Sequence, residues 1–147
     1  MKKAILVVSF GTTYENSLKN SIEALENDIR ASFPEYDVFR AFTSSIVIKR
    51  LNERGISTDS VSEALEKLAS NGYSSVTVQP THIINGIEFE KMCSVCETFS
   101  SRFSHICTGV PLFNSESDME YVCQFFKNEF GTDSAAAFMG HGTEAAS

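Results

Sequence analysis

Short apolar runs alternate with amphipathic stretches along almost the whole chain. The first run, at 3–9, is nearly continuous, which is typical of a strand buried on both faces of a parallel sheet. Apolar residues then recur every three or four positions as far as Phe33, and Pro34 ends the predicted helix. The same alternation predicts further strands at 36–42, 75–79, 105–109 and 135–139, and helices at about 45–54, 59–71, 88–103 and 116–130.

This alternation predicts an α/β fold, in which right-handed crossovers place helices on both faces of a parallel sheet. In such sheets the chemistry takes place beyond the carboxyl ends of the strands. The segments 10–13, 81–90 and 140–143 follow three of the predicted strands. We therefore expect these three segments to meet at one edge of the sheet.

Length and charge narrow the class of protein. The 147 residues suffice for one domain with a substantial core. The net charge is −7 and basic residues occur at most two in a row, which argues against a nucleic-acid-binding surface. The apolar run after Lys2 and Lys3 is too short for a signal peptide or a membrane span. We expect a cytoplasmic protein with neither nucleic-acid nor membrane partners.

Two familiar chemistries are disfavoured by spacing. The turn at 9–13 contains one glycine and no lysine, so it matches neither a dinucleotide-binding nor a phosphate-binding loop. Cys93 and Cys96 have the spacing of a zinc or redox pair, but the chain has no second such pair. Both thiols lie on the apolar stripe of a predicted helix, so we expect them to pack in the core.

One strand ending occurs twice in the sequence. An apolar run leads into Phe10-Gly11-Thr12, and another leads into the turn that contains His141, followed by Gly142 and Thr143. The two copies are separated by roughly the length of a small α/β domain. We therefore predict a first module at 1–133 and the opening strand of a second module at 134–147.

Five stretches, in this order along the chain, resemble the anaerobic cobalt chelatases of the CbiK type: MKKAILVVSFGTTYENS, FRAFTSSIVIKRL, THIINGIEFEKM, GVPLF and FMGHGTE. Members of that family fold as two similar α/β halves across a cleft and are nearly twice as long as this chain. The resemblance implies insertion of Co²⁺ into sirohydrochlorin in the anaerobic route to cobalamin, with Ni²⁺ and Fe²⁺ as ions that similar ligands accept. It matches this chain to the first half of such an enzyme.

The resemblance also implies site residues. It matches His141 to the metal-binding histidine of the family and Glu88 to an acidic residue facing the same cleft, and we take these two as the catalytic candidates. A neutral imidazole suits Co²⁺ and accepts a proton near neutral pH. We expect Phe10 to contact the tetrapyrrole. We expect Arg40, Thr43 and Ser44 to contact the carboxylates of the tetrapyrrole.

Simpler interpretations of several residues stay open. His141 is alternatively an ordinary turn residue, and Glu88 a carboxylate favoured by the dipole at the start of a helix. We expect His82 to pack or to lie in a loop, and His105 to face solvent.

Three functions follow from these patterns. The first is the N-terminal portion of a cobalt chelatase, which needs a missing C-terminal half. The second is a single-domain chelatase that forms its cleft from two copies, and the third is a non-catalytic module that binds a tetrapyrrole or a metal. Because a half-module exposes the apolar surface meant for its partner, we expect homo-oligomers.

The metal assignment predicts that the parent chain binds cobalt weakly and that His141→Ala removes this binding. Cys93→Ala is the control and is expected to bind as the parent does, because its thiol is predicted to pack in the core. Calorimetric titration with Co²⁺ measures both variants. Equal binding by the parent and His141→Ala would contradict the assignment of His141.

Overall fold

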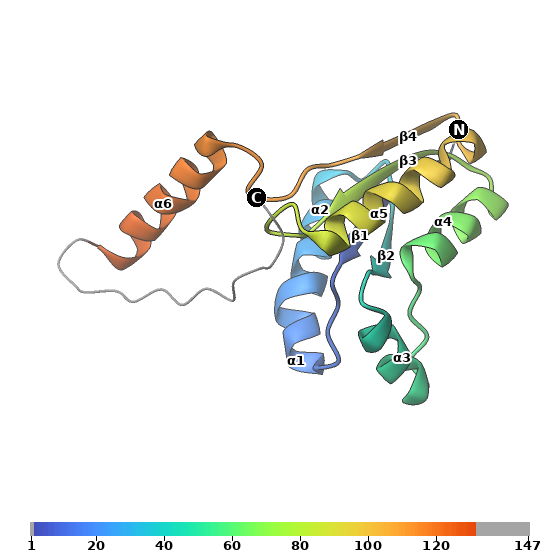
Figure 1. Cartoon of the computed structure of the whole chain (residues 1–147), viewed down its shortest axis with the longest axis horizontal. Coiled ribbons are helices and arrows are strands. Elements are labelled where there is room, and N and C mark those ends of the chain that lie inside the picture. The colour runs from blue at the N-terminus through green and yellow to red at the C-terminus, as the bar shows by residue number, and fades with distance from the viewer. Residues whose placement is uncertain (1, 132–147) are drawn as a thin grey trace.

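A computed structural model describes residues 2–131. The strands are β1 (Lys2–Ser9), β2 (Asp37–Phe42), β3 (Tyr73–Pro80) and β4 (His105–Thr108). They form one sheet in the order β2-β1-β3-β4, and every pairing is parallel (Figure 1). The first strand of the chain is therefore an inner strand of the sheet, as its continuous apolar sequence predicts.

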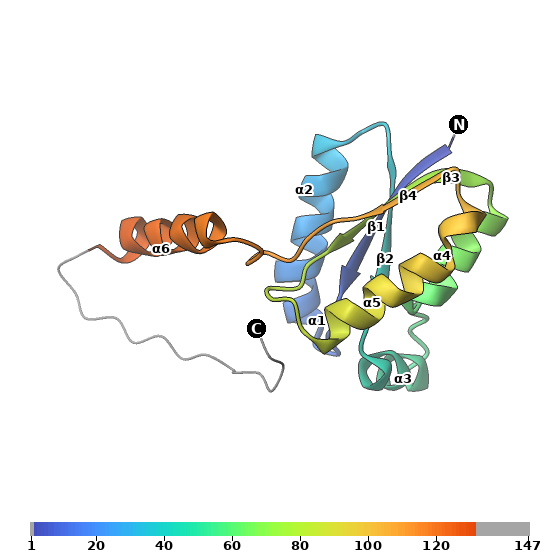
Figure 2. The same cartoon turned by 45° about the horizontal axis from the view of Figure 1, so that its top comes forward.

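Helical segments lie between and after the strands. They are α1 (Glu15–Ser17), the π-helical η1 (Leu18–Glu23), α2 (Ala24–Ser32), α3 (Ser45–Glu53), α4 (Val61–Ser70), α5 (Ile87–Thr98), the 3-10 turn η2 (Ser100–Arg102) and α6 (Glu116–Phe130). The continuous helix α1–η1–α2 lies on one face of the sheet, and α4 and α5 lie on the other (Figure 2). The predicted α/β class is therefore confirmed. Figures 1 and 2 both show α6 extending away from the sheet.

The main core lies between the sheet and the pair α4 and α5. Alternate residues of β1 point to this side, and Ala4, Leu6 and Val8 are fully buried there. The helices contribute the following buried side chains: Val61, Ala64, Leu65, Leu68, Met92 and Cys96. The core position of Cys96 is confirmed, and Cys93 packs against the same cluster.

The predicted helix at 88–103 is too long. In the structure α5 ends at Thr98, a 3-10 turn follows, and Phe103 has an extended backbone. The chain has to reverse direction here to begin β4 at His105, and Phe103 reaches the core from the extended segment, where it is buried. Phe103 fitted the spacing of the apolar helix positions in the sequence because its side chain packs on the same core as those positions.

The opposite face of the sheet is only partly covered. Leu25 of α2 and Phe33, the residue that follows this helix, remain 41% and 46% exposed. They border a hollow of about 340 Å³ that also touches Ile5 and Thr77. The helix therefore covers part of this face and leaves apolar surface beside β3 open.

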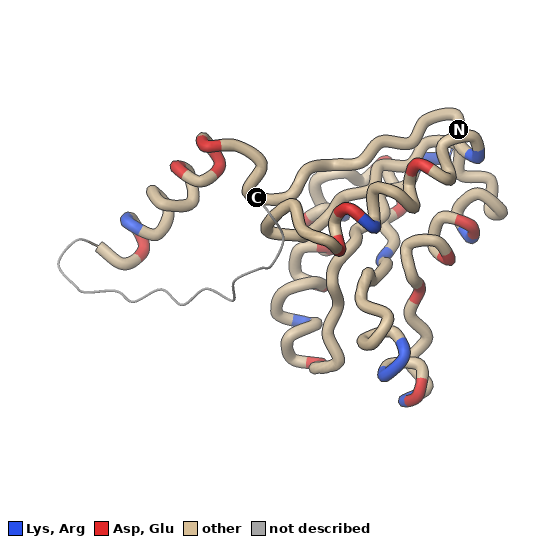
Figure 3. The backbone as a smooth tube through the Cα atoms, viewed as in Figure 1, with Lys and Arg blue, Asp and Glu red and all other residues tan. Residues whose placement is uncertain are grey.

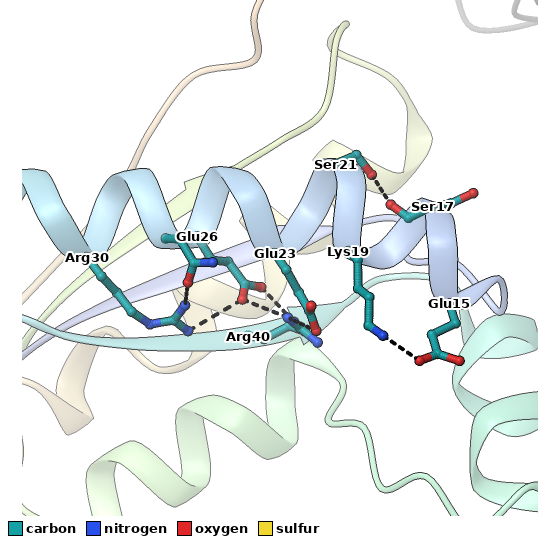
Figure 4. A network of polar contacts seen from close by, with 9 residues as sticks. Glu15, Ser17, Lys19, Ser21, Glu23, Glu26, Arg30 and Arg40 are labelled. Atoms are coloured by element: carbon teal, nitrogen blue, oxygen red, sulfur yellow. Dashed lines mark hydrogen bonds and ion pairs between the residues drawn. The ribbon is translucent and has the colours of Figure 1, made fainter.

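A buried ion pair fastens α2 to β2 (Figure 4). The side chain of Glu26 is 1% exposed, and Arg40 donates to its two oxygens over 2.6 and 2.7 Å. Arg30 adds a longer contact of 3.4 Å and Glu23 accepts a further bond from Arg40. The carboxylate beside it raises the pKa of Arg40 further, so this guanidinium stays charged.

Two predictions concern residues that the structure does not describe. They are the strand expected at 135–139 and the opening of a second module at 134–147. Between residues 2 and 131, no helix has the length and apolar character that crossing a bilayer requires.

The ion pair predicts a stability change. Arg40→Met leaves the Glu26 carboxylate buried with only its long contact to Arg30, and the free energy of unfolding should fall by about 3 kcal/mol. Urea denaturation measures this loss. The double variant Glu26→Met/Arg40→Met should recover most of it, because no buried charge is then left alone.

The matched control is Lys19→Met, which removes the cation of the exposed pair between Lys19 and Glu15. Solvent screens that pair, so the free energy of unfolding should be unchanged. If Arg40→Met and Lys19→Met had the same free energy of unfolding, the buried pair would not stabilise the fold.

Candidate functional site at the carboxyl edge of the sheet

The segments that follow β1, β2 and β3 are fastened to one another. The amide of Thr43 donates to the carbonyl of Ser9 over 2.9 Å, and the amide of Thr81 donates to that of Val8 over 2.9 Å. The hydroxyl of Thr81 donates to that of Ser9 over 2.9 Å. Two of the three predicted segments, 10–13 and 81–90, therefore meet at the carboxyl edge, and the third, 140–143, lies outside the described residues.

A glycine turn exposes Phe10. Gly11 has φ of 98°, a conformation that residues with a Cβ rarely adopt. A Cβ at this position would also lie 2.6 Å from the ring of Phe42. The turn is thus specific for glycine and leaves Phe10 53% exposed beside the end of β1.

Apolar side chains surround this edge. We call Phe10, Ile83, Ile84, Ile87, Val110 and Leu112 the apolar rim; each is between 43% and 57% exposed. The amides of Leu112 and Phe113 donate to the carbonyls of His82 and Ile83 over 3.0 and 2.8 Å, so two of its loops are joined. A concentration of exposed apolar residues on one edge marks a surface for a ligand or a partner.

Thr43 and Glu88 meet at this edge. Both line a hollow of about 140 Å³ between β2, α4 and α5. The hydroxyl of Thr43 is buried without a hydrogen-bond partner in the described chain. Glu88 lies in the first turn of α5, and one carboxylate oxygen is 3.1 Å from the ammonium of Lys91. Its place in the first turn fits a helix-start carboxylate, and its role as a site residue stays a prediction.

Ser44 and Arg40 already have structural partners. Ser44 is buried and caps α3, accepting a hydrogen bond from the amide of Val47 over 3.4 Å. Arg40 lies within β2 and holds Glu26, although it also lines a hollow of about 580 Å³ beside Thr12. Contact of these two residues with a ligand's carboxylates stays a prediction, and Arg40 would have to share its guanidinium with Glu26.

Although the chain is acidic, α3 carries two consecutive basic residues, Lys49 and Arg50, with Glu53 at its end (Figure 3). Lys49 and Arg50 form no ion pair or hydrogen bond within the described chain. Arg54 donates to the carbonyl of Thr13 over 2.9 Å, which joins the end of α3 to the segment after β1. A local positive surface therefore adjoins the carboxyl edge and favours anionic ligands there.

His82, which we expected only to pack or to lie in a loop, packs against Phe89 and is, with Thr43, a residue of this edge whose buried polar atoms have no hydrogen-bond partner within residues 2–131. Neither ring nitrogen has a hydrogen-bond partner among residues 2–131, and both are buried. Burial lowers the pKa of His82, while the negative charge of Glu88 opposes that shift. The available signal was its place two residues beyond a parallel strand. His105, by contrast, is exposed as predicted.

A metal site does not arise from the described residues alone. Across 2–131, no three His, Cys, Asp or Glu side chains gather closely enough to hold an ion. His141, the predicted metal ligand, lies outside this range. The carboxyl edge therefore offers an apolar surface, a carboxylate and two orphaned polar side chains.

Comparison with known proteins shows which family the chain resembles. The family model described as cobalt chelatase (CbiK) matches residues 3–147. A sirohydrochlorin cobaltochelatase of Salmonella typhimurium is 42% identical over 146 residues, which are 97% of this chain and 55% of the relative. The sirohydrochlorin cobaltochelatase CbiKC of Nitratidesulfovibrio vulgaris is 33% identical over 97% of this chain and 52% of its own length. The chain thus spans about half the length of these curated relatives.

A solved structure shares the fold. The crystal structure of a CbiX protein of Marinobacter aquaeolei superposes with a TM-score of 0.59 at 13% identity, over 88% of this chain and 96% of the other. The matched family model covers nearly the whole sequence, from the start of β1 to the last residue. The chain therefore belongs to the cobalt chelatase (CbiK) family.

Proposed function

We propose that the chain forms one wall of a sirohydrochlorin cobaltochelatase, which inserts Co²⁺ into the macrocycle as two pyrrole protons leave. The observation that carries the proposal is the meeting of the apolar rim with Glu88 and Thr43 at one edge of a chain of this family. A flat tetrapyrrole needs an apolar surface for its ring and a few polar groups that fix its orientation.

The chemistry needs weak metal ligands and a proton acceptor. A complete ligand set would retain the ion, so one imidazole with a carboxylate nearby suits an ion that has to be released. In the proposal His141 holds Co²⁺ and, once the ion passes to the macrocycle, its freed imidazole accepts a pyrrole proton near neutral pH. Glu88, which faces the same cleft, assists the transfer of the second proton. Phe10 and the other residues of the rim hold one face of the ring.

Charge recognition is assigned to the basic surface beside this edge. Sirohydrochlorin carries eight carboxylic acid groups, and a chain of net charge −7 would otherwise repel it. Lys49, Arg50 and Arg54 supply local positive charge, and Arg40, Thr43 and Ser44 are the proposed partners of individual carboxylates.

The half-length match supports a particular organisation. In this organisation, residues 1–133 form the first module and 134–147 begin a second. The second module supplies the remaining metal ligands. The complete enzyme acts in the cytoplasm. A cleft formed by two copies of this chain is the second candidate, and the exposed apolar rim favours it because such a surface also suits self-association.

Activity separates these candidates. The purified 147-residue chain should insert cobalt into sirohydrochlorin no faster than the uncatalysed background. A positional error near 1 Å at an incompletely supported site costs about a hundredfold in rate. Adding the second half of a longer relative should restore the rate, measured by the change in visible absorption on metalation with Co²⁺, Ni²⁺ or Fe²⁺.

In the restored enzyme, Glu88→Gln should lower the rate by about a hundredfold or more, as expected for loss of a group that assists proton transfer. Glu90→Gln, a neighbouring exposed carboxylate of α5, is the matched control and should retain activity. A clear His141-dependent rate from the short chain alone would favour the cleft of two identical copies. Binding without insertion in the restored protein would favour the non-catalytic module.

A further inference from the structure

The residue His82 is held in place by its neighbours, but its imidazole forms no hydrogen bond within residues 2–131. Thr81 is fixed to β1 through its amide and its hydroxyl, and the carbonyl of His82 accepts from the amide of Leu112. The ring packs edge-on against Phe89, with ring centres 6.3 Å apart. The residue is thus constrained on both sides, while its two buried nitrogens have no partner among the described residues.

An imidazole in this state has unused hydrogen-bonding capacity. Whichever tautomer is present, one nitrogen carries a proton and can donate. A buried donor without an acceptor is unfavourable and rare in folded proteins. A nearby acceptor with a free oxygen would therefore be drawn to His82.

Glu88 is such an acceptor. Its Oε1 is 3.1 Å from Lys91, and its other oxygen has no hydrogen bond within the described chain. The side chain of Lys91 is 67% exposed, so this ion pair is screened by solvent and weak. Glu88 directly precedes Phe89 in α5, and the ring of Phe89 packs against that of His82, so the carboxylate starts from a position next to the imidazole. The negative charge of Glu88 also counteracts the lowering of the His82 pKa by burial.

We infer that the Glu88 carboxylate has two alternative positions, the observed one on Lys91 and a second one in which it accepts a hydrogen bond from His82. His82 acts through Glu88 and is therefore a positioning residue. The significance of the second position rests on the proposed function, because it would hold the carboxylate beside the apolar rim. The existence of the two positions does not depend on any substrate.

The test uses nuclear magnetic resonance of the histidine rings in the full chain, without metal or tetrapyrrole. Lys91→Met removes the competing partner, so Glu88 should turn to His82 and raise its pKa by about one unit. A slowly exchanging imidazole proton should appear at low field. In the double variant Glu88→Gln/Lys91→Met both changes should be absent, because the effect passes through the carboxylate.

Two controls accompany this test. Lys19→Met removes a lysine from another exposed helical pair and should leave His82 unchanged, which separates a specific effect from the loss of one positive charge. The ring resonances of the exposed His105 should be the same in every variant. An unchanged pKa of His82 in Lys91→Met, or a rise that persists in the double variant, would overturn the inference. Neither result bears on cobalt insertion, so failure here is distinguishable from failure of the proposed function.

Discussion

The parallel pairing of β1 with both β2 and β3 is the constraint on which the candidate site depends. Because parallel strands end at the same edge of a sheet, this pairing places Phe10, Thr43 and His82 beyond three adjacent strand ends. The pairing continues into the loops, where Thr43 and Thr81 donate to carbonyls of β1. The core that holds β1 is thus also the support of the site.

The same edge combines two properties that soluble domains usually keep apart. It exposes the apolar rim and at the same time buries polar atoms of Thr43 and His82 that have no partner within residues 2–131. Each property alone has an ordinary explanation, namely a partner surface or an internal water molecule. Together they support the proposal that another component completes this surface. The half-length match to cobalt chelatases gives an independent reason to expect one.

Local patterns predicted most of the fold, and long-range contacts account for what they missed. The continuous apolar run identified β1, and the spacing of apolar residues identified α6 with its observed bounds. The pair between Glu26 and Arg40 joins residues far apart in sequence, so no local pattern indicated it. The position of the His82 ring likewise depends on contacts made in the fold, with Phe89 of α5 against the ring and the amide of Leu112 on the carbonyl. The strand pattern predicted that the segment containing Glu88 lies at this edge, and only the family resemblance suggested a role for its carboxylate.

The most direct measurement of the central claim is the map of amide resonances that move when metal-free sirohydrochlorin is added to the isotope-labelled chain. We predict that the changes concentrate in the segments 10–13, 43–44, 81–88 and 110–113, which form the carboxyl edge. We expect little change along the open groove beside Ile5 and Phe33, although that groove is also apolar. Changes confined to that groove, with the carboxyl edge unaffected, would show that the tetrapyrrole does not bind at the carboxyl edge.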